Sequence, residues 1–370
     1  MKKLTALVDM GASMTKYGVD GEVENASLPN NIVIRDTPST VYKMSDNRLD
    51  NFEIYITTED DKKDTPVEKI LNKYISFGMY ATRGSDTSIR PSMDDKKCSQ
   101  PLNYASIIAT LAYEAERGNL WGKVRVALAV PPIEIKQARE SFKALIGTYT
   151  VRLVGGGRLA DDEHTVEIDE VVCFEEPLLT AMAFMFSKRG PKHPELLGKT
   201  LLFFDIGAST TDLGIFKGKS YQDNSQKTIR IGCNIVRDTL KDAIYEKYEV
   251  LLDVEDLDTA IRTGVIEICG TKENIVGILD DVRCRCAAKI RAELTTYFKD
   301  KNVDIKTLGG LVFSGGGSLS ADSEDVEDSK SVGYFIGELF PGIPCYYFGE
   351  NARFANVEGL ATCVMFFDKN

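Results

Sequence analysis

Two stretches of the chain have the same order of apolar and polar positions. Residues 4–18 (LTALVDMGASMTKYG) and 201–214 (LLFFDIGASTTDLG) each begin with an apolar run that ends in Asp, followed by Gly, Ser and Thr. Such a run predicts a buried strand, and the small residues after it predict a tight turn. The copies open the first and second halves of the chain, so we predict an internal duplication.

The remaining pattern predicts alternating strands and helices. Apolar residues at helical spacing predict helices, and continuous apolar runs predict buried strands. A polar stretch over 19–100 predicts a small α+β insertion, which includes one helix-like segment and one exposed loop. We expect helices at 66–82, 101–118, 133–147 and 274–298, a buried strand at 123–132, and the exposed loop at 92–100.

Three local features need an interpretation. Gly155–Gly157 stand between two alternating segments, which favours a hairpin turn over a phosphate loop. Cys286 lies on the apolar stripe of the 274–298 helix and is predicted to be a core residue rather than a metal ligand. Trp121 stands in a connection, where we expect it to pack against the protein rather than to contact a ligand.

The duplicated turns are suited to phosphate. Gly11 and Gly207 allow the backbone to approach a ligand, and N–H groups in such a turn attract anions. Asp9 and Asp205 cannot bind phosphate directly, so they predict a divalent metal ion with its water shell. The alternative is a pair of ordinary hairpins in which these residues serve only the turn. Hydroxyl groups are supplied by Ser13, Thr15, Ser209, Thr210 and Thr211.

Composition narrows the class of protein. A chain of 370 residues predicts about two domains. The net charge of −11 argues against general nucleic-acid binding, and two His disfavour zinc sites and His-dependent nucleophilic catalysis. Eight Cys without a CxxC motif predict reduced thiols in a cytoplasmic protein. No apolar run approaches ~18 residues, so we expect no membrane span, and the apolar part of MKKLTALVDM is too short for a signal peptide.

A third element brings these features together. Residues 308–320 (LGGLVFSGGGSLS) predict a strand that runs into a triple Gly. Together with the two Asp turns and the segments FEEPLLTAMAF (174–184) and FANVEGLATCVMF (354–366), this resembles the five ATPase motifs of the actin, chaperone and sugar-kinase superfamily, in order. The stretch IGCNIVRDTLKDAI and the ending RFANVEGLA are most similar to plasmid-segregation actins of the ParM/StbA type.

The resemblance implies an α/β fold. It consists of duplicated actin-like (ribonuclease H-like) domains, each a mixed β-sheet flanked by helices, with a nucleotide cleft between the halves. We expect domain I at 1–180, with an insertion subdomain at about 19–100. Domain II is expected at 181–370, with an insertion subdomain at about 221–305.

The resemblance also implies roles for individual residues. Asp9 and Asp205 would hold Mg²⁺ through water, and Glu176, with Glu175 as the fallback, would position the water that attacks ATP. Both Glu residues also favour the N-terminus of a helix, whose dipole attracts acids. The implied nucleotide-binding residues are Gly11, Ala12, Ser13, Lys16, Gly207, Ala208, Ser209, Thr210, Thr211, Asp212, Gly232, Gly315, Gly316, Gly317 and Ser318.

The implied function is a filament that assembles with ATP and disassembles on hydrolysis. Its partners would be other copies of the chain and a DNA-binding adaptor at a centromere-like site, without direct nucleic-acid or membrane binding. Two alternatives stay open: a small-metabolite kinase of the same fold, and a regulatory ATPase that does not polymerise. The choice between ATP and GTP also stays open.

Overall fold

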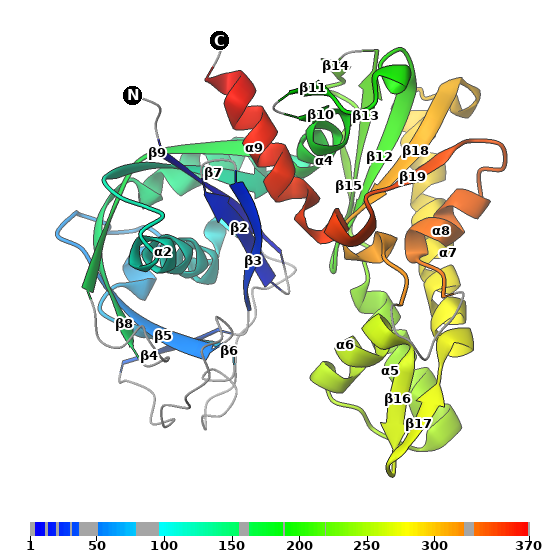
Figure 1. The fold of residues 1–370 in the computed structure, drawn as a ribbon, viewed down its shortest axis with the longest axis horizontal. Helices are drawn as coiled ribbons and strands as arrows, with labels where there is room; N and C mark the ends of the chain where they lie inside the picture. The colour runs from blue at the N-terminus through cyan, green and yellow to red at the C-terminus, as the bar shows by residue number, and fades with distance from the viewer. Residues whose placement is uncertain are drawn as a thin grey trace. The chain divides into compact units, whose positions relative to one another are not determined.

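The computed structural model describes residues 4–11, 14–19, 22–29, 32–36, 51–78, 96–154, 163–187, 189–218, 220–321 and 329–368 (Figure 1). The chain divides into two units. The first combines Met1–Leu179 with Asn356–Asn370, and the second is Thr180–Ala355. Two helices therefore carry the chain across the unit boundaries: α4 (Glu176–Met185) and α9 (Ala355–Phe367).

The first unit is built on a nine-stranded mixed sheet in the order β3-β2-β1-β7-β9-β8-β5-β6-β4. At its centre, β1 pairs antiparallel with β2 and parallel with β7, and β7 pairs parallel with β9. The strands are β1 (Leu4–Met10), β2 (Met14–Val19), β3 (Glu22–Pro29), β4 (Ile32–Arg35), β5 (Asn51–Thr57), β6 (Tyr74–Gly78), β7 (Lys123–Val130), β8 (Gly147–Val154) and β9 (Glu163–Glu175).

The central strand β7 is buried on both faces, from Val124 to Val130. Val126 and Leu128 of β7 belong to the core that α2 (Pro101–Glu116) completes, and Figure 1 shows α2 lying along the sheet. On the opposite face of β7, Arg125 donates hydrogen bonds to Glu170 of β9 and to Asp368 just beyond α9. The ion pairs of Arg125 thus hold the C-terminal segment on this sheet.

Two predicted helices of this unit differ in the structure. The helix predicted at 66–82 is wrong: its described part holds only a 3₁₀ turn at Glu68–Ile70 and then strand β6. Asn72 has a left-handed φ of 57°, which ends any helix, and β6 pairs with β4 and β5. The helix predicted at 133–147 is shorter, α3 (Ile135–Ser141) followed by a 3₁₀ turn.

Two further predictions concern the hairpin at Gly155–Gly157 and the packing of Trp121. The strands that flank Gly155–Gly157 pair antiparallel, as a hairpin requires, although those glycines lie outside the described residues. Trp121 does not pack as expected, since 70% of its surface is exposed.

The second unit is built on a six-stranded sheet in the order β14-β13-β12-β18-β19, with β15 also pairing with β13. The apolar run of β12 is buried on both faces. Phe204 joins the core beneath the long helices of the unit, whereas Phe203 packs with residues of α4. The strands are β12 (Thr200–Ile206), β13 (Thr211–Lys217), β14 (Ser220–Tyr221), β15 (Lys227–Ile229), β18 (Leu308–Ser314) and β19 (Cys345–Tyr347).

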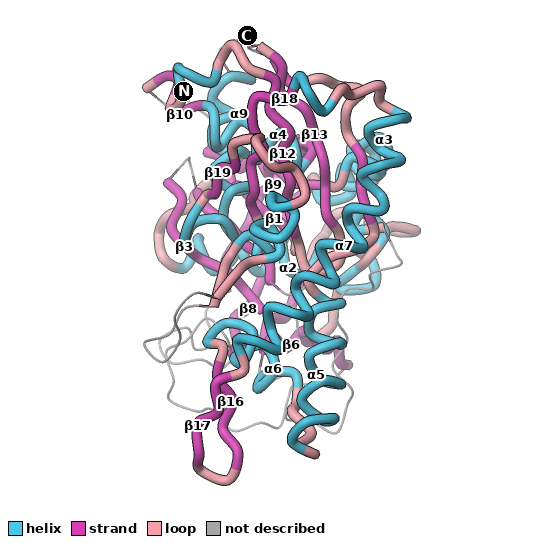
Figure 2. Tube along the Cα trace, turned by 90° about the vertical axis from the view of Figure 1, so that its right-hand side faces the viewer, coloured by secondary structure: helices cyan, strands magenta, loops and turns pink. Residues whose placement is uncertain are grey.

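Beyond this sheet lie two long helices and a hairpin (Figure 2). The predicted helix at 274–298 is confirmed as α7, and Cys286 on its apolar stripe is fully buried, as predicted. Within the described ranges, no helix is long and apolar enough to cross a membrane. The elements are α5 (Asn234–Tyr248), α6 (Val254–Thr263), β16 (Val265–Ile268), β17 (Thr271–Asn274), α7 (Val276–Asp300) and α8 (Val332–Glu338), with the short pair β10 (Phe186–Ser187) and β11 (Gly190–Pro191) after α4.

The two sheets share one local plan. In the first unit β1 has an antiparallel partner (β2) and a parallel one (β7). In the second unit β12 likewise pairs antiparallel with β13 and parallel with β18. The predicted duplication is therefore present in the topology.

The contact between α4 and α9 predicts a stability effect. A Cβ on Gly359 of α9 would overlap the carbonyl oxygen of Leu179 in α4. We expect Gly359→Ala to lower the free energy of unfolding by about 2 kcal/mol, measured by urea denaturation. Gly277→Ala in α7 is the matched control, because a Cβ there meets no atom within 4 Å. Equal stability of the two variants would contradict the predicted close contact.

Candidate functional site

The two Asp turns have matching backbone geometry. Asp9 lies near the end of β1 and Asp205 near the end of β12. Two residues later, the N–H of Gly11 donates to the carbonyl of Met14 at 3.0 Å, and the N–H of Gly207 donates to that of Thr210 at 2.9 Å. Each turn is thus closed by a hydrogen bond from its Gly to the residue three positions on. Ala12 and Ser13 lie outside the described residues.

The carboxylate of Asp9 is buried among positive charges. Its exposed fraction is 3%, and Lys16, opposite it on β2, lies 3.2 Å away, Nζ to Oδ2. Burial alone would raise the pKa of Asp9. The charges of Lys16 and Lys97, with hydrogen bonds from Lys16 and Asn356, outweigh burial and bring the pKa below its ordinary value. Asp9 is therefore held as a buried anion.

Glu176 is the first residue of α4 and is also buried, with an exposed fraction of 5%. Its Oε1 lies 2.6 Å from Nζ of Lys97. The backbone N–H of Lys97 donates to Glu134, which follows the end of β7. Asp9, Glu134 and Glu176 thus lie at or just after the ends of the neighbouring parallel strands β1, β7 and β9, with the Lys97 side chain among them.

In the second unit, the turn that contains Gly207 and Ala208 is fixed by the start of α5. The N–H groups of Cys233 and Asn234 donate to the carbonyls of Gly207 and Ala208 at 3.0 and 2.7 Å. A Cβ on Gly232 would lie 2.7 Å from backbone atoms of both Gly207 and Ala208. Only glycine at 232 allows this close backbone contact.

The polar side chains of this turn have partners within the protein. Thr210 and Thr228 donate to the two carboxylate oxygens of Asp212 at 2.9 and 2.6 Å. The Thr211 hydroxyl donates to the carbonyl of Ile231, and Asn234 contacts the Ser209 hydroxyl at 3.4 Å. Thr211 and Asp212 are almost fully buried. These side chains stabilise the shape of the turn.

The triple glycine meets the same turn. Strands β12 and β18 are parallel neighbours, so Asp205 lies beside Ser314. Gly315 has φ of 75°, and a Cβ there would lie 2.5 Å from Oδ1 of Asp205. A Cβ on Gly317 would overlap Ile206, whereas Gly316 has open space, and the hydroxyl of Ser318 donates to the carbonyl of Gly315.

Solved structures resemble the chain over its whole length. Bacillus thuringiensis ParM with AMPPNP matches with a TM-score of 0.70 and 16% identity, covering 100% of both chains. A non-polymerisable quadruple mutant of pCBH ParM matches with a TM-score of 0.70 and 19% identity, covering 100% of both. Ta0583, an archaeal actin homolog, matches with a TM-score of 0.69 and 14% identity, covering 98% of this chain and 99% of its own.

The chain has the actin-like fold.

This result confirms the predicted fold class and the resemblance on which it rested. No family model and no curated protein sequence matches the chain. The fold is thus recognisable from the few motifs that carry the turns, and from the structure, while overall sequence similarity is low.

Asp9 and Asp205 each have the chemistry of a ligand for a divalent metal ion. In the described part of the chain, no three His, Cys, Asp or Glu side chains gather as a metal cluster. Mg²⁺ does not need one, because proteins usually hold it with one or two carboxylates, phosphate oxygens and water. Asp9 and Asp205 are each a buried carboxylate beside a tight glycine turn, and a carboxylate is the kind of ligand such an ion uses.

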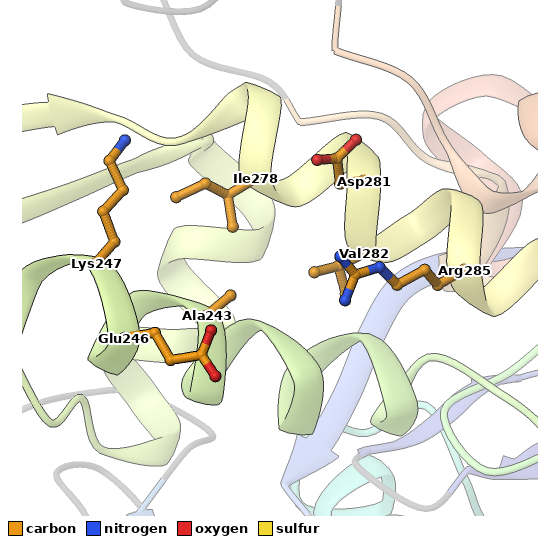
Figure 3. Close-up of a pocket in the computed structure, with 7 residues that line it drawn as sticks. All are labelled: Ala243, Glu246, Lys247, Ile278, Asp281, Val282 and Arg285. Atoms are coloured by element: carbon orange, nitrogen blue, oxygen red, sulfur yellow. The ribbon is translucent and has the colours of Figure 1, made fainter.

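One pocket of the structure lies away from these turns. It has a volume of about 300 Å³ and opens between α5 and α7 (Figure 3). Figure 3 shows charged side chains from both helices around it, among them Glu246, Asp281 and Arg285. None of the predicted site residues lines it.

Three residues that lie around Asp9 and Glu176 in the first unit were not predicted from the sequence: Lys97, Glu134 and Asn356. The segment 92–100 was expected to be an exposed loop, but its described part contains a 3₁₀ turn, Lys97–Ser99, with Cys98 buried. Lys97 follows an equally charged Lys96, so the local sequence does not distinguish the inward side chain from the outward one. Asn356 lies in the recognised FANVEGLA segment, which was the available signal.

The lowered pKa of Asp9 predicts a pH-dependent effect of Lys16. A carboxyl with a lowered folded-state pKa adds stability above its ordinary pKa of 3.8 and loses it as the pH falls through the folded value. We expect Lys16→Met to lower the free energy of unfolding by about 2 kcal/mol at pH 7, with the difference shrinking below pH 3.8.

Urea denaturation across pH measures this difference. Lys143→Met is the control, because the ammonium of Lys143 forms an exposed ion pair with Glu140. This variant should change stability by less than about 0.5 kcal/mol. A Lys16→Met difference that does not depend on pH would contradict the pairing with Asp9.

Proposed function

We propose that the chain is an actin-like ATPase that forms filaments with ATP and Mg²⁺ and disassembles them on hydrolysis. The observation that carries the proposal is the repeated Asp–Gly turn, which has the same closing hydrogen bond after the first strand of each sheet plan. A single such turn is common in hairpins. Two copies at equivalent places in a duplicated fold are suited to the two sides of one polyphosphate.

The proposed nucleotide-binding residues are those of the two Asp–Gly turns and of the triple glycine. Asp9 and Asp205 would hold Mg²⁺ through its water shell, and the ion would neutralise phosphate charge. The N–H groups of the two turns would bind the β- and γ-phosphates. Gly315–Gly317, where a side chain at 315 or 317 would strike the protein itself, would lie against the α-phosphate and nucleoside. Lys16 would contact the phosphates in addition to Asp9.

Support for nucleotide binding comes from similar folds. The matching ParM structures from B. thuringiensis were solved with AMPPNP, ATP and ADP. At 16% identity, the similarity to these structures supports the fold. The choice between ATP and GTP is left to experiment.

Support for assembly comes from the same comparison. One matching protein is described as a non-polymerisable mutant of ParM, which makes polymerisation the property to test. Head-to-tail contacts between identical chains produce open filaments. A cytoplasmic filament that segregates plasmid DNA through an adaptor is the specific role we propose.

Light scattering tests this proposal. Right-angle scattering is followed at micromolar protein with Mg²⁺ after adding ATP, or GTP in parallel, while phosphate release is measured. A rise that decays as phosphate appears supports a dynamic filament. Flat scattering, with turnover only after a pool of metabolites is added, contradicts the filament and supports a kinase. Flat scattering with slow turnover supports a regulatory ATPase.

The water-positioning role of Glu176 gives a sharper prediction. We expect Glu176→Ala to retain nucleotide binding and assembly but to slow phosphate release by about 100-fold or more, because the attacking water loses its acceptor. Glu175→Ala, one residue earlier, is the matched control. If the control loses hydrolysis and Glu176→Ala does not, the role belongs to Glu175.

A further inference from the structure

Lys97 is the hydrogen-bond partner of the Glu176 carboxylate in the described part of the chain. Its Nζ lies 2.6 Å from Oε1 of Glu176, and both side chains are largely buried, with exposed fractions of 20% and 7%. Carboxylates accept hydrogen bonds at both oxygens. The contact with Lys97 therefore occupies Oε1 and leaves Oε2 to accept from another donor.

The backbone of Lys97 is held at both ends. Its N–H donates to Oε2 of Glu134 at 2.7 Å, and its carbonyl accepts from Nδ2 of Asn103 at 2.9 Å. Cys98, the next residue, is fully buried, and α2 begins at Pro101. A long Lys side chain normally samples many rotamers, but here its base is fixed and its end is paired.

The carboxylates that surround Glu176 need a compensating positive charge, which Lys97 supplies. Asp9, Glu134 and Glu176 converge near the ends of three adjacent strands, and like charges in a buried place disfavour one another. Burial raises the pKa of Glu134, although Lys97 opposes that effect. For Lys97 itself, burial would lower the pKa, but Glu176 and Asp9 more than compensate and keep it above its ordinary value. Lys97 is thus a permanent cation.

A gain in folding stability is a weak explanation for the ion pair between Lys97 and Glu176. Removing two charges from water costs about as much as their attraction returns, so a buried ion pair contributes little net stability. A charged pair does fix the direction of a carboxylate, because the ammonium holds one oxygen at hydrogen-bond distance. Fixed orientation matters where the carboxylate must present its other oxygen to a reactant.

We propose that Lys97 is a positioning residue for ATP hydrolysis, holding Oε1 of Glu176 so that Oε2 faces the attacking water. This inference rests on the proposed function. Lys97 acts through Glu176 and keeps its carboxylate correctly turned.

The test compares hydrolysis with nucleotide binding in Lys97→Met. We expect its affinity for a fluorescent ATP analogue to stay within ~3-fold of the wild type, while single-turnover hydrolysis slows by about 30-fold or more. Lys97→Arg, which keeps the charge, is expected to recover part of the rate. Lys96→Met is the matched control, because the exposed Lys96 side chain donates to Gln137 rather than to the Glu176 carboxylate. We expect this variant to hydrolyse ATP at the wild-type rate.

A double-mutant cycle with Glu176→Gln separates positioning from other roles. If Lys97 acts through Glu176, adding Lys97→Met to Glu176→Gln slows hydrolysis little further. An equal slowing in both backgrounds shows that Lys97 acts independently of Glu176 and overturns the inference. If Lys97→Met does not fold, Lys97→Gln, which removes the charge but keeps a donor, provides the same comparison.

The wild type in the same assay distinguishes the two proposals. Wild-type hydrolysis together with unchanged hydrolysis in Lys97→Met overturns the role of Lys97 and leaves the proposed function intact. A wild type that binds ATP without hydrolysing it overturns the proposed function, and this inference with it.

Discussion

Burial of carboxylates at the ends of parallel strands is the constraint on which the first unit depends. A buried anion is costly unless positive charge or hydrogen bonds compensate it. Lys16 on the neighbouring strand pairs with Asp9, and Asn356 of α9 forms a hydrogen bond with the same carboxylate. Lys97, in the segment before α2, donates a hydrogen bond to Glu176. Elements distant in sequence are therefore brought to one edge of the sheet by charge compensation as well as by apolar packing.

In the second unit, the constraint is the close approach of backbone segments, and glycine residues satisfy it. Its turn consists of backbone in close contact with backbone: Gly232 against Gly207 and Ala208, and Gly315 against Ile206, with the Asp205 carboxylate equally near Gly315. The hydroxyl and carboxylate groups of the turn stabilise its shape, as Thr210 and Thr228 do on Asp212. The first unit thus supplies buried charge, and the second supplies a rigid turn with accessible backbone.

Sequence patterns predicted the elements whose signal is local. The Asp–Gly turns, the strand before the triple glycine and the long helix α7 with buried Cys286 are each indicated by runs and spacing. Prediction was wrong where tertiary pairing decided the outcome. The segment that holds β6 has helix-forming residues, but Asn72 interrupts it, and β4 and β5 pair with the strand after that residue. Trp121 shows the same limit for packing, since no local pattern indicates whether a connection is covered.

By itself, the sequence determined the duplicated plan, the actin-like fold and the positions of Asp9, Asp205, Glu176 and the glycines, because each depends on a short run of residues with its own conformational preference. Only the tertiary structure decided which charges meet. Lys96 and Lys97 are identical in sequence terms, yet Lys96 is exposed while Lys97 reaches Glu176, 79 positions away. The physical reason is that electrostatic pairing depends on distance in space, which a one-dimensional pattern does not contain.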